Sequence, residues 1–332
     1  MNRHAVLTTL KKRQNLLILL GMILVCSLIS DRFLTVNNAI NIARQISIVT
    51  IMAFGETLLI ISGGIDLSVG AVAGMAGVLG CEVFIATQSI ALAVLVGIVM
   101  GAIPGALNGF VVTKFGAPPF IVTLAMQSVA SGVIFFHTNG QNVYNIGKFN
   151  TLGQGSVGIV PIPIIIMLLT GAVIYVILEK MKFGRYLYAI GGNENAAIGS
   201  GIQVNKVKFI TYVICGALAG LAGIVLMSRL NAGLPAAGTG YETDALMATI
   251  IGGTSFTGGI GTAVGTLIGS LIMGILNNIF NLTGVQAYIQ QILKGVLIVV
   301  AVVIDLYTKR NKKRVKIYIE KTKQVGIRGV EP

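Results

Sequence analysis

The sequence has 332 residues, of which 55% are apolar and only 11% are charged, and its mean hydropathy is +0.87. A soluble domain carries roughly 25% charged residues, so this composition excludes an ordinary soluble protein. The formal net charge of +13 does not predict nucleic-acid binding, because many of the basic residues lie after Tyr307. A membrane protein commonly has such a basic flank beside its helices.

Apolar segments bounded by Gly, Pro or charged residues recur along the chain, and each is close to the length that a helix needs to cross a bilayer. The sequence therefore predicts an all-α polytopic membrane protein with about ten transmembrane helices. We expect one transmembrane domain over 1–332, with an N-terminal segment 1–15, a helical bundle 16–305 and a basic tail 306–332. The expected helices cover residues 16–30, 39–61, 68–87, 90–112, 119–137, 161–179, 207–228, 241–253, 261–280 and 287–305.

The basic residues are unevenly distributed between the segments that connect these helices. If both termini are cytoplasmic, only Arg32, Lys148 and Arg229 fall in outer segments, whereas the N-terminal segment, the inner loops and the tail hold nearly all the others. Basic residues beside transmembrane helices stay on the cytoplasmic side. We therefore expect both termini to be cytoplasmic.

One expected helix is too short for a regular crossing. The run 241–253 has about 13 residues, which at 1.5 Å per residue cover about 20 Å of a core roughly 30 Å thick. Thr239 and Glu242 form a capping-box pattern at its start, and Gly252 and Gly253 follow it. We expect a half-helix here, which is tolerated at membrane depth only where protein or a water-filled cavity surrounds it.

A similar break is expected after the second helix, where Gly63 and Gly64 interrupt the apolar pattern. Asp66 or Ser68 then provides a side chain that can cap the next helix. Capping alone explains an acidic residue at that position.

Glycines recur at every fourth position in two of the expected helices, which gives each a flat face for close helix packing. They are Gly97, Gly101, Gly105 and Gly109 in one helix and Gly261, Gly265 and Gly269 in the other. In both helices the glycine series leads into similar segments, GALNGF at 105–110 and GILNNIF at 274–280. Because the two helices run in opposite directions in the expected topology, this similarity favours an inverted repeat, and transporters bind substrate near such a repeat interface.

The repeat directs attention to Asn108, Asn277 and Asn278, whose amides suit a hydroxylated solute in a translocation path. Glu56 is the acidic residue placed most deeply in an apolar segment, and such a residue is a functional candidate by default. It is also included in the candidate path. A proton-coupling carboxylate and a structural carboxylate bonded to neighbouring Ser and Thr both fit its position.

The chain has no G-x-x-x-x-G-K-[ST] phosphate loop, so ATP binding by that route is excluded. His4 and His137 are the only histidines, neither has a second ligand beside it in the sequence, and the three cysteines are isolated in apolar segments. We therefore expect no metal site, no cofactor and no covalent catalysis in this chain. A role in permeation remains.

The longest inner connection contains a short helix pattern. Asn193 is a good N-cap, Glu194 favours the helix dipole, and Gly199 provides the stop. The expected docking segment consists of Asn193, Glu194, Asn195, Ala196, Ala197, Ile198 and Gly199. It either lies on the membrane surface or docks into a groove of another protein.

Three long motifs occur in order: SGGIDLSVGAVAGMAG, then YAIGGNENAAIGSGI followed by VNKVK, and AGTGYETDALMATIIGGTSFTGGIGTAVGTLIG. Together they resemble the ribose/xylose/galactose-type permeases of bacterial ABC importers, over about residues 39–305. The resemblance implies a type II-like, non-catalytic permease subunit in the inner membrane, dimeric with a second copy or a paralogue. It further implies an external sugar-binding protein and a cytoplasmic ATPase whose two nucleotide-binding domains hold ATP and Mg. The family's coupling helix would map onto Asn193–Gly199.

Three other functions stay open on the sequence alone. A proton-coupled secondary transporter would use Glu56 as its relay. An ABC permease for another small polar solute, such as a branched-chain amino acid, would share the same architecture. A membrane scaffold or sensor would bind partners and move no solute.

Overall fold

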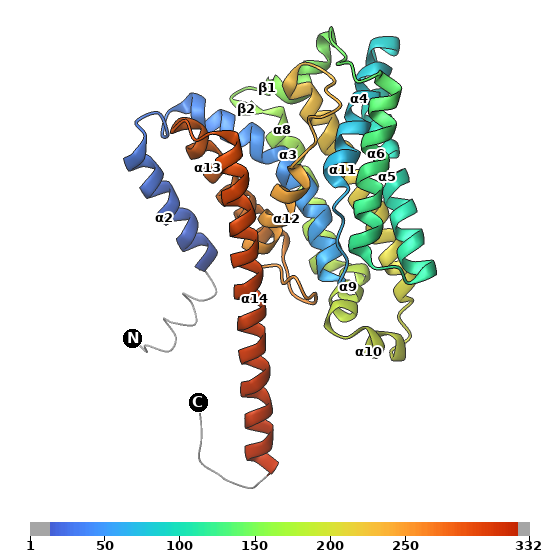
Figure 1. Ribbon diagram of the computed structural model, residues 1–332, viewed down its shortest axis with the longest axis vertical. Coiled ribbons are helices and arrows are strands. Elements are labelled where there is room, and N and C mark those ends of the chain that lie inside the picture. The colour runs from blue at the N-terminus through green and yellow to red at the C-terminus, as the bar shows by residue number, and fades with distance from the viewer. Residues whose placement is uncertain (1–13, 325–332) are drawn as a thin grey trace. The chain divides into compact units, whose positions relative to one another are not determined.

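The computed structural model describes residues 14–324, most of which are helical (Figure 1). The chain divides into two units, the first ending at Gln286 and the second beginning at Ala287. The elements of the first unit are α2 (Gln14–Ile29), α3 (Val36–Ile61), α4 (Val69–Thr87), α5 (Ile90–Phe115), α6 (Pro119–Thr138), η1 (Gly147–Asn150), α7 (Thr151–Gln154), β1 (Ser156–Val157), β2 (Val160–Pro161), α8 (Ile162–Lys180), α9 (Lys182–Gly192), α10 (Glu194–Gly199), α11 (Val204–Leu230), α12 (Tyr241–Ile251) and α13 (Ala263–Leu282).

The second unit contains the helix α14 (Ala287–Gln324). Its apolar part is Ala287–Val303, and the helix then continues through much of the segment expected to be a basic tail. The expected N-terminal segment 1–15 lies almost entirely outside the described residues.

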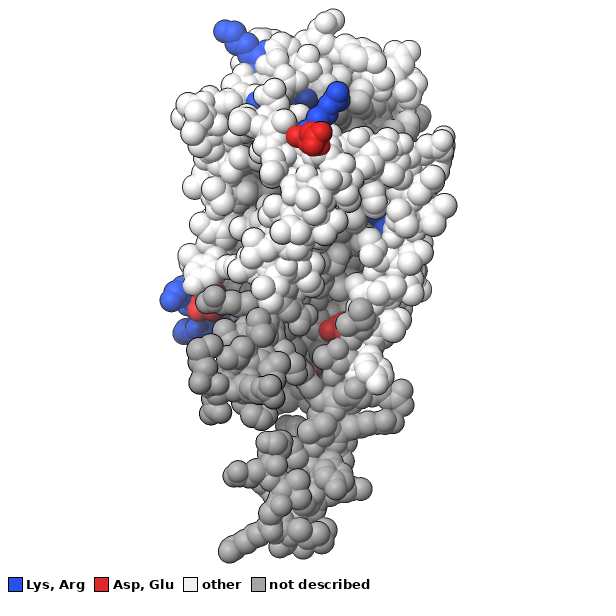
Figure 2. All heavy atoms as spheres, turned by 90° about the vertical axis from the view of Figure 1, so that its left-hand side faces the viewer, with Lys and Arg blue, Asp and Glu red and all other residues white. Residues whose placement is uncertain are grey.

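Among the described residues, seven helices are long and apolar enough to cross a membrane: α3, α4, α5, α6, α8, α11 and α13. Each of the ten expected segments coincides with a helix, but α2, α12 and the apolar part of α14 are shorter than a full crossing. On the face shown in Figure 2 the described side chains are almost all uncharged, as a lipid-facing surface requires. The prediction of an all-α polytopic membrane protein is confirmed.

Two triplets of helices organise the first unit. In α3–α4–α5 and in α11–α12–α13, a long helix is followed by an irregular connection, a shorter helix and a second long helix. The first helix of each triplet packs against the other two helices of the opposite triplet: α11 packs against α4 and α5, and α3 packs against α12 and α13. The C-terminal end of α3 lies beside α9 and the N-terminal end of α11 follows α10, so the two triplets run in opposite directions. This arrangement is that of an inverted repeat.

Glycines allow the closest of these contacts. A Cβ atom added at Gly101 of α5 would lie 2.2 Å from the carbonyl oxygen of Gly216 in α11. One added at Gly105 would lie 2.4 Å from the carbonyl oxygen of Tyr212, and one added at Gly97 would meet the side chain of Ile224 at 2.3 Å. The backbones of α5 and α11 therefore touch over several turns.

The second triplet has a smaller contact of the same kind, in which a Cβ atom at Gly252 would lie 2.4 Å from the carbonyl oxygen of Gly265 in α13. Gly252 thus serves close packing at the end of α12. Gly63 and Gly253, which we expected as hinge glycines, have positive φ angles of 81° and 95°, which glycine adopts without strain. Gly64 packs near the hydroxyl of Tyr212.

The capping predictions need correction at the starts of α4 and α12. The N-cap of α12 is Gly240, with φ of 89°, and the Glu242 carboxylate accepts its N–H at 3.1 Å, so Thr239 is not the cap. Ser68 is the N-cap of α4 but its side chain makes no capping hydrogen bond. Asp66 instead accepts the Ser68 N–H at 2.8 Å, because its side chain turns into the bundle rather than over the first turn of α4.

The connection between α8 and α11 contains one helix more than expected. α9 precedes α10 and buries Gly184, Leu187 and Ile190, which follow one another at a spacing of three residues and so lie on one face. α10 forms where the Asn193 cap predicts it, since the Asn193 Oδ1 accepts the Ala196 N–H at 3.0 Å.

Candidate functional site

A cluster of polar side chains is buried between α3, α4 and α5. Asp66 precedes α4, and its Oδ1 accepts both the N–H of Ser68 at 2.8 Å and the hydroxyl of Ser68 at 2.5 Å. Its Oδ2 accepts the Nδ2 of Asn108, from α5, at 3.2 Å. Asp66, Ser68 and Asn108 are each at most 2% exposed. Asp66 therefore holds the start of α4 against α5.

Glu56 of α3 borders this cluster and is 1% exposed. Its Oε2 accepts the backbone N–H of Asp66 at the long distance of 3.4 Å, and its Oε1 lies 4.0 Å from the Sγ of Cys215 in α11. The neighbouring Ser and Thr hydroxyls that the sequence suggested as partners do not appear in these contacts. The Glu56 carboxylate lies between α3, the start of α4 and α11.

A matching contact occurs in the second triplet. The Nδ2 of Asn277, in α13, donates to the Oδ2 of Asp244 in the first turn of α12 at 3.2 Å. Asn108 and Asn277 occupy the equivalent positions of the two repeated segments. In each triplet an Asn near the end of the last helix thus binds an Asp that lies just before or within the first turn of the middle helix.

The amide oxygens of these two asparagines share another property. The Oδ1 of Asn108 and the Oδ1 of Asn277 are buried and accept no hydrogen bond. Leaving a buried acceptor unpaired costs about 1–3 kcal/mol. Each triplet therefore keeps one unused acceptor beside its Asp–Asn contact.

Asn278 belongs to a third contact. Its Nδ2 donates to the Oδ1 of Asn38 at 2.7 Å, and the Nδ2 of Asn38 donates back to the Oδ1 of Asn278 at 3.0 Å. Asn38 also donates to the carbonyl oxygen of Phe33 at 2.8 Å. This pair joins α13 to the first turn of α3.

The four residues of the expected path are thus all buried, and the structure distributes them over these three contacts. They do not line the cavity of about 300 Å³ between α3, α8 and α13. That cavity has an apolar lining, which includes Phe54, Met167, Gly171, Tyr175, Val264 and Leu267. Sequence reasoning interpreted Asp66 only as a cap and passed over Asp244, although an acidic residue in an apolar segment is the signal for a functional position.

The α9–α10 segment forms the surface at one end of the first unit (Figure 1). In α10 the side chain of Ile198 is 56% exposed and Ala196 is exposed, whereas Ala197 is only 3% exposed. Lys208 of α11 binds the carboxylate of Glu194 at 2.7 Å. The exposed surface of α10 therefore combines the apolar Ala196 and Ile198 with the polar Glu194 and Asn195.

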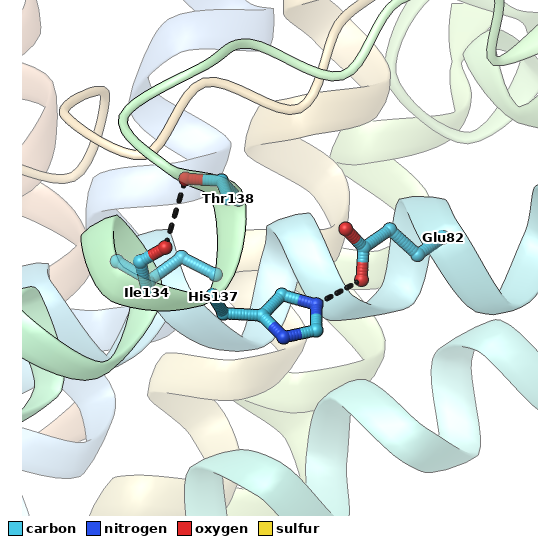
Figure 3. A network of polar contacts seen from close by, with 4 residues as sticks. All are labelled: Glu82, Ile134, His137 and Thr138. Atoms are coloured by element: carbon cyan, nitrogen blue, oxygen red, sulfur yellow. Dashed lines mark hydrogen bonds and ion pairs between the residues drawn. The ribbon is translucent and has the colours of Figure 1, made fainter.

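His137, near the end of α6, forms a hydrogen bond with Glu82 of α4 (Figure 3). Its Nε2 lies 2.7 Å from the Oε2 of Glu82, which joins the end of α6 to α4. Both side chains are partly exposed, and such pairs contribute about 0–1 kcal/mol. The described residues contain no group of three His, Cys, Asp or Glu side chains that could hold a metal ion.

Broken helices, an inverted repeat and buried polar contacts between apolar helices are together characteristic of membrane transport proteins. The chain belongs to the family described as branched-chain amino acid transport system / permease component, which it matches over residues 38–302.

Curated relatives in this family are similar over nearly their whole length. The ribose import permease protein RbsC of Escherichia coli K12 is 43% identical over 310 residues, which are 92% of this chain and 95% of that protein. RbsC of Bacillus subtilis is 42% identical over 86% of this chain and 89% of its own. The D-allose transport system permease protein AlsC of Escherichia coli K12 is 38% identical over 84% and 86%. No solved structure matches the chain.

Proposed function

We propose that this chain is the membrane-spanning permease subunit of an ATP-driven importer for a monosaccharide or a similar polyol. The observation that carries the proposal is the likeness to permeases named for ribose import and allose transport, at up to 43% identity over up to 92% of the chain. These names favour a sugar over the branched-chain amino acid in the family's description. The chain has no phosphate loop, so a partner ATPase would bind ATP and Mg and hydrolyse the ATP.

The orientation and the partners follow from the charge distribution and from the family. Lys180 ends α8, and Lys182 and Arg185 lie at the start of α9, which favours a cytoplasmic position for α9 and α10. Both termini are then cytoplasmic, in the inner membrane of a bacterium. α10 contacts the ATPase with its two nucleotide-binding domains, the segments 138–160 and 229–243 face the sugar-binding protein, and the permease pairs with a second copy or a paralogue.

The two Asp–Asn contacts are the parts of the bundle best suited to a hydroxylated solute. Asn108 and Asn277 each keep a buried acceptor, and a sugar hydroxyl is a donor that would satisfy it. Because the triplets are inverted, the contacts belong to opposite halves of the translocation path. Movement of α4 and α12 would open them alternately as the ATPase shifts the population between inward-open and outward-open states. Glu56 and Asn278 lie beside these contacts.

The proposal is tested by purifying the tagged chain from its native host in mild detergent and identifying the proteins that accompany it by mass spectrometry. We expect an ATPase with phosphate loops in stoichiometric amount, and sugar uptake by the complex in liposomes that requires ATP and the binding protein. Uptake that instead follows a proton gradient, with no ATPase recovered, would establish the secondary transporter.

A charge on the exposed face of α10 is expected to uncouple ATP hydrolysis from sugar uptake. Ile198→Asp and Ala196→Asp place a carboxylate on the surface proposed to dock into the ATPase, and burying an unpaired charge at an interface costs several kcal/mol. We expect uptake to fall about tenfold or more, while the amount of the variant in the membrane stays unchanged. Uptake and ATP hydrolysis are measured together in liposomes.

Two controls accompany this measurement. Gln88→Glu adds a charge to an exposed residue between α4 and α5, outside the proposed contact segments, and should leave uptake unchanged. Ala197→Asp is unsuitable, because Ala197 is buried and its replacement would disturb the packing of α10. Normal uptake by Ile198→Asp would remove α10 from the coupling mechanism.

A further inference from the structure

We infer that Gly191, Ile61 and Gly259 form a rigid joint through which movement of α9 and α10 reaches both helix triplets. The inference rests on the proposed function and assigns Gly191 as a positioning residue in the coupling of ATP hydrolysis to transport. We call these three residues the glycine joint.

The joint begins at the C-terminal end of α3. Ile61 is the last residue of that helix, so its carbonyl oxygen has no partner within the helix. The N–H of Gly259 donates to this oxygen at 2.9 Å. Gly259 belongs to the connection between α12 and α13, with φ of 76°. The C-terminal end of α3, in the first triplet, is thus hydrogen-bonded to the α12–α13 loop of the second triplet.

α9 is seated against this contact through backbone atoms. A Cβ atom added at Gly191 would lie 1.8 Å from the carbonyl oxygen of Ile61 and 2.4 Å from the nitrogen of Gly259. The carbonyl oxygen of Gly191 in turn lies 3.0 Å from the position of a Cβ atom at Gly258. No side chain fits at this junction, so α9 touches both triplets with its backbone.

A second contact between α9 and the α12–α13 loop lies one turn earlier in α9. The hydroxyl of Tyr188 donates to the carbonyl oxygen of Gly261 at 2.8 Å. Gly261 precedes α13 by two residues, so this hydrogen bond fixes α9 to the beginning of that helix. Both contacts therefore join α9 to the loop between α12 and α13.

These contacts place α9 directly between the docking surface and the moving parts of the bundle. Asn193 alone separates α9 from α10. Beyond Ile61 the chain leads to Asp66 and the start of α4, and on either side of Gly259 it leads to α12 and α13. Packed backbone contacts do not deform gradually, so a displacement of α10 is passed to both triplets instead of being absorbed by flexible side chains.

The chain supplies a matched control in the neighbouring residue. Gly192 is also at the end of α9, yet an added Cβ atom there meets nothing within 4 Å, and its φ angle lies outside the left-handed region. Gly191→Ala and Gly192→Ala are therefore the same substitution at adjacent positions, with the joint disturbed only in the first.

The experiment compares both variants in the complete importer, with the ATPase and the binding protein, reconstituted in liposomes. The measured quantity is the amount of sugar taken up per ATP hydrolysed. We expect Gly191→Ala to lower this ratio about tenfold or more, within the 5–150-fold range of ordinary coupling energies. Gly192→Ala should stay within about twofold of the unmodified protein, as surface substitutions do. An unchanged ratio of uptake to ATP hydrolysis in Gly191→Ala would overturn the inference that the glycine joint transmits the movement.

A milder variant covers the case in which Gly191→Ala does not assemble. Tyr188→Phe removes only the hydrogen bond to Gly261 and should lower the ratio several-fold, whereas Tyr186→Phe, at a partly exposed position, should not. Equal ratios in these two variants would also overturn the joint. Failure of the unmodified chain to assemble with an ATPase would instead overturn the proposed function, so the two failures are distinguishable.

Discussion

Replacing Gly101 with leucine is expected to prevent α5 from packing against α11 and to remove most of the folded protein from the membrane. The first side-chain carbon would lie 2.2 Å from the carbonyl oxygen of Gly216 and 2.7 Å from the nitrogen of Gly220. Both obstacles are backbone atoms, so no side-chain rotation relieves the clash. Overpacking commonly costs about 1–3 kcal/mol, and we expect this substitution to reach or exceed the upper value.

The measurement is the amount of monodisperse protein after detergent extraction, together with its thermal unfolding temperature. Gly132→Leu provides the control, because Gly132 lies in α6 with nothing within 4 Å of an added Cβ atom, and it should leave both quantities unchanged. A Gly101→Leu variant that unfolds at the temperature of the unmodified protein would contradict the observed contact between α5 and α11.

Replacing Asp66 with leucine is expected to abolish uptake and to destabilise the start of α4. Two buried donors, the N–H and the hydroxyl of Ser68, lose their acceptor, and the Asn108 amide keeps only its hydrogen bond to the Ser68 hydroxyl at 3.1 Å. Each unsatisfied buried donor costs about 1–3 kcal/mol. Asp244→Leu should abolish uptake as well, because it removes the acceptor for Asn277 in the equivalent contact of the other triplet.

A double-mutant cycle checks the origin of these losses. Removing both partners leaves fewer unpaired groups than removing one, so Asp66→Leu combined with Asn108→Leu should be less destabilised than the sum of the two single variants. Thermal unfolding and uptake are measured for all four proteins. Strictly additive losses, or full uptake by Asp66→Leu, would show that the Asp66–Asn108 contact has no role.

Glu56→Gln distinguishes the importer from the proton-coupled alternative at the same cluster. Glutamine retains an oxygen that accepts the N–H of Asp66, so an ATP-driven permease should keep its uptake. A relay carboxylate would lose all activity on this change. The substitution is therefore expected to be tolerated, and a well-folded but inactive variant would restore the proton-relay interpretation.

Several features of the fold could be predicted because local sequence carries them. Apolar length located the helices, and the Asn193 cap with the Gly199 stop located α10. α9 was missed because its buried face consists of only three residues within a segment rich in glycine and charge. The cap of α12 was misplaced by one residue, since Gly240 adopts a positive φ that the capping-box pattern does not anticipate.

The sequence by itself determined the class of protein, the helical segments, the broken helices and the short helix α10, because hydropathy, caps and glycine spacing act over a few neighbouring residues. Only the tertiary structure decided which polar groups meet. Asp66 and Asn108 are 42 residues apart, and Asp244 and Asn277 are 33 apart. The contact of Gly191 with Ile61 and Gly259 joins three separate segments. These pairings depend on how each helix is rotated and placed against its neighbours, which is settled by packing across the whole bundle.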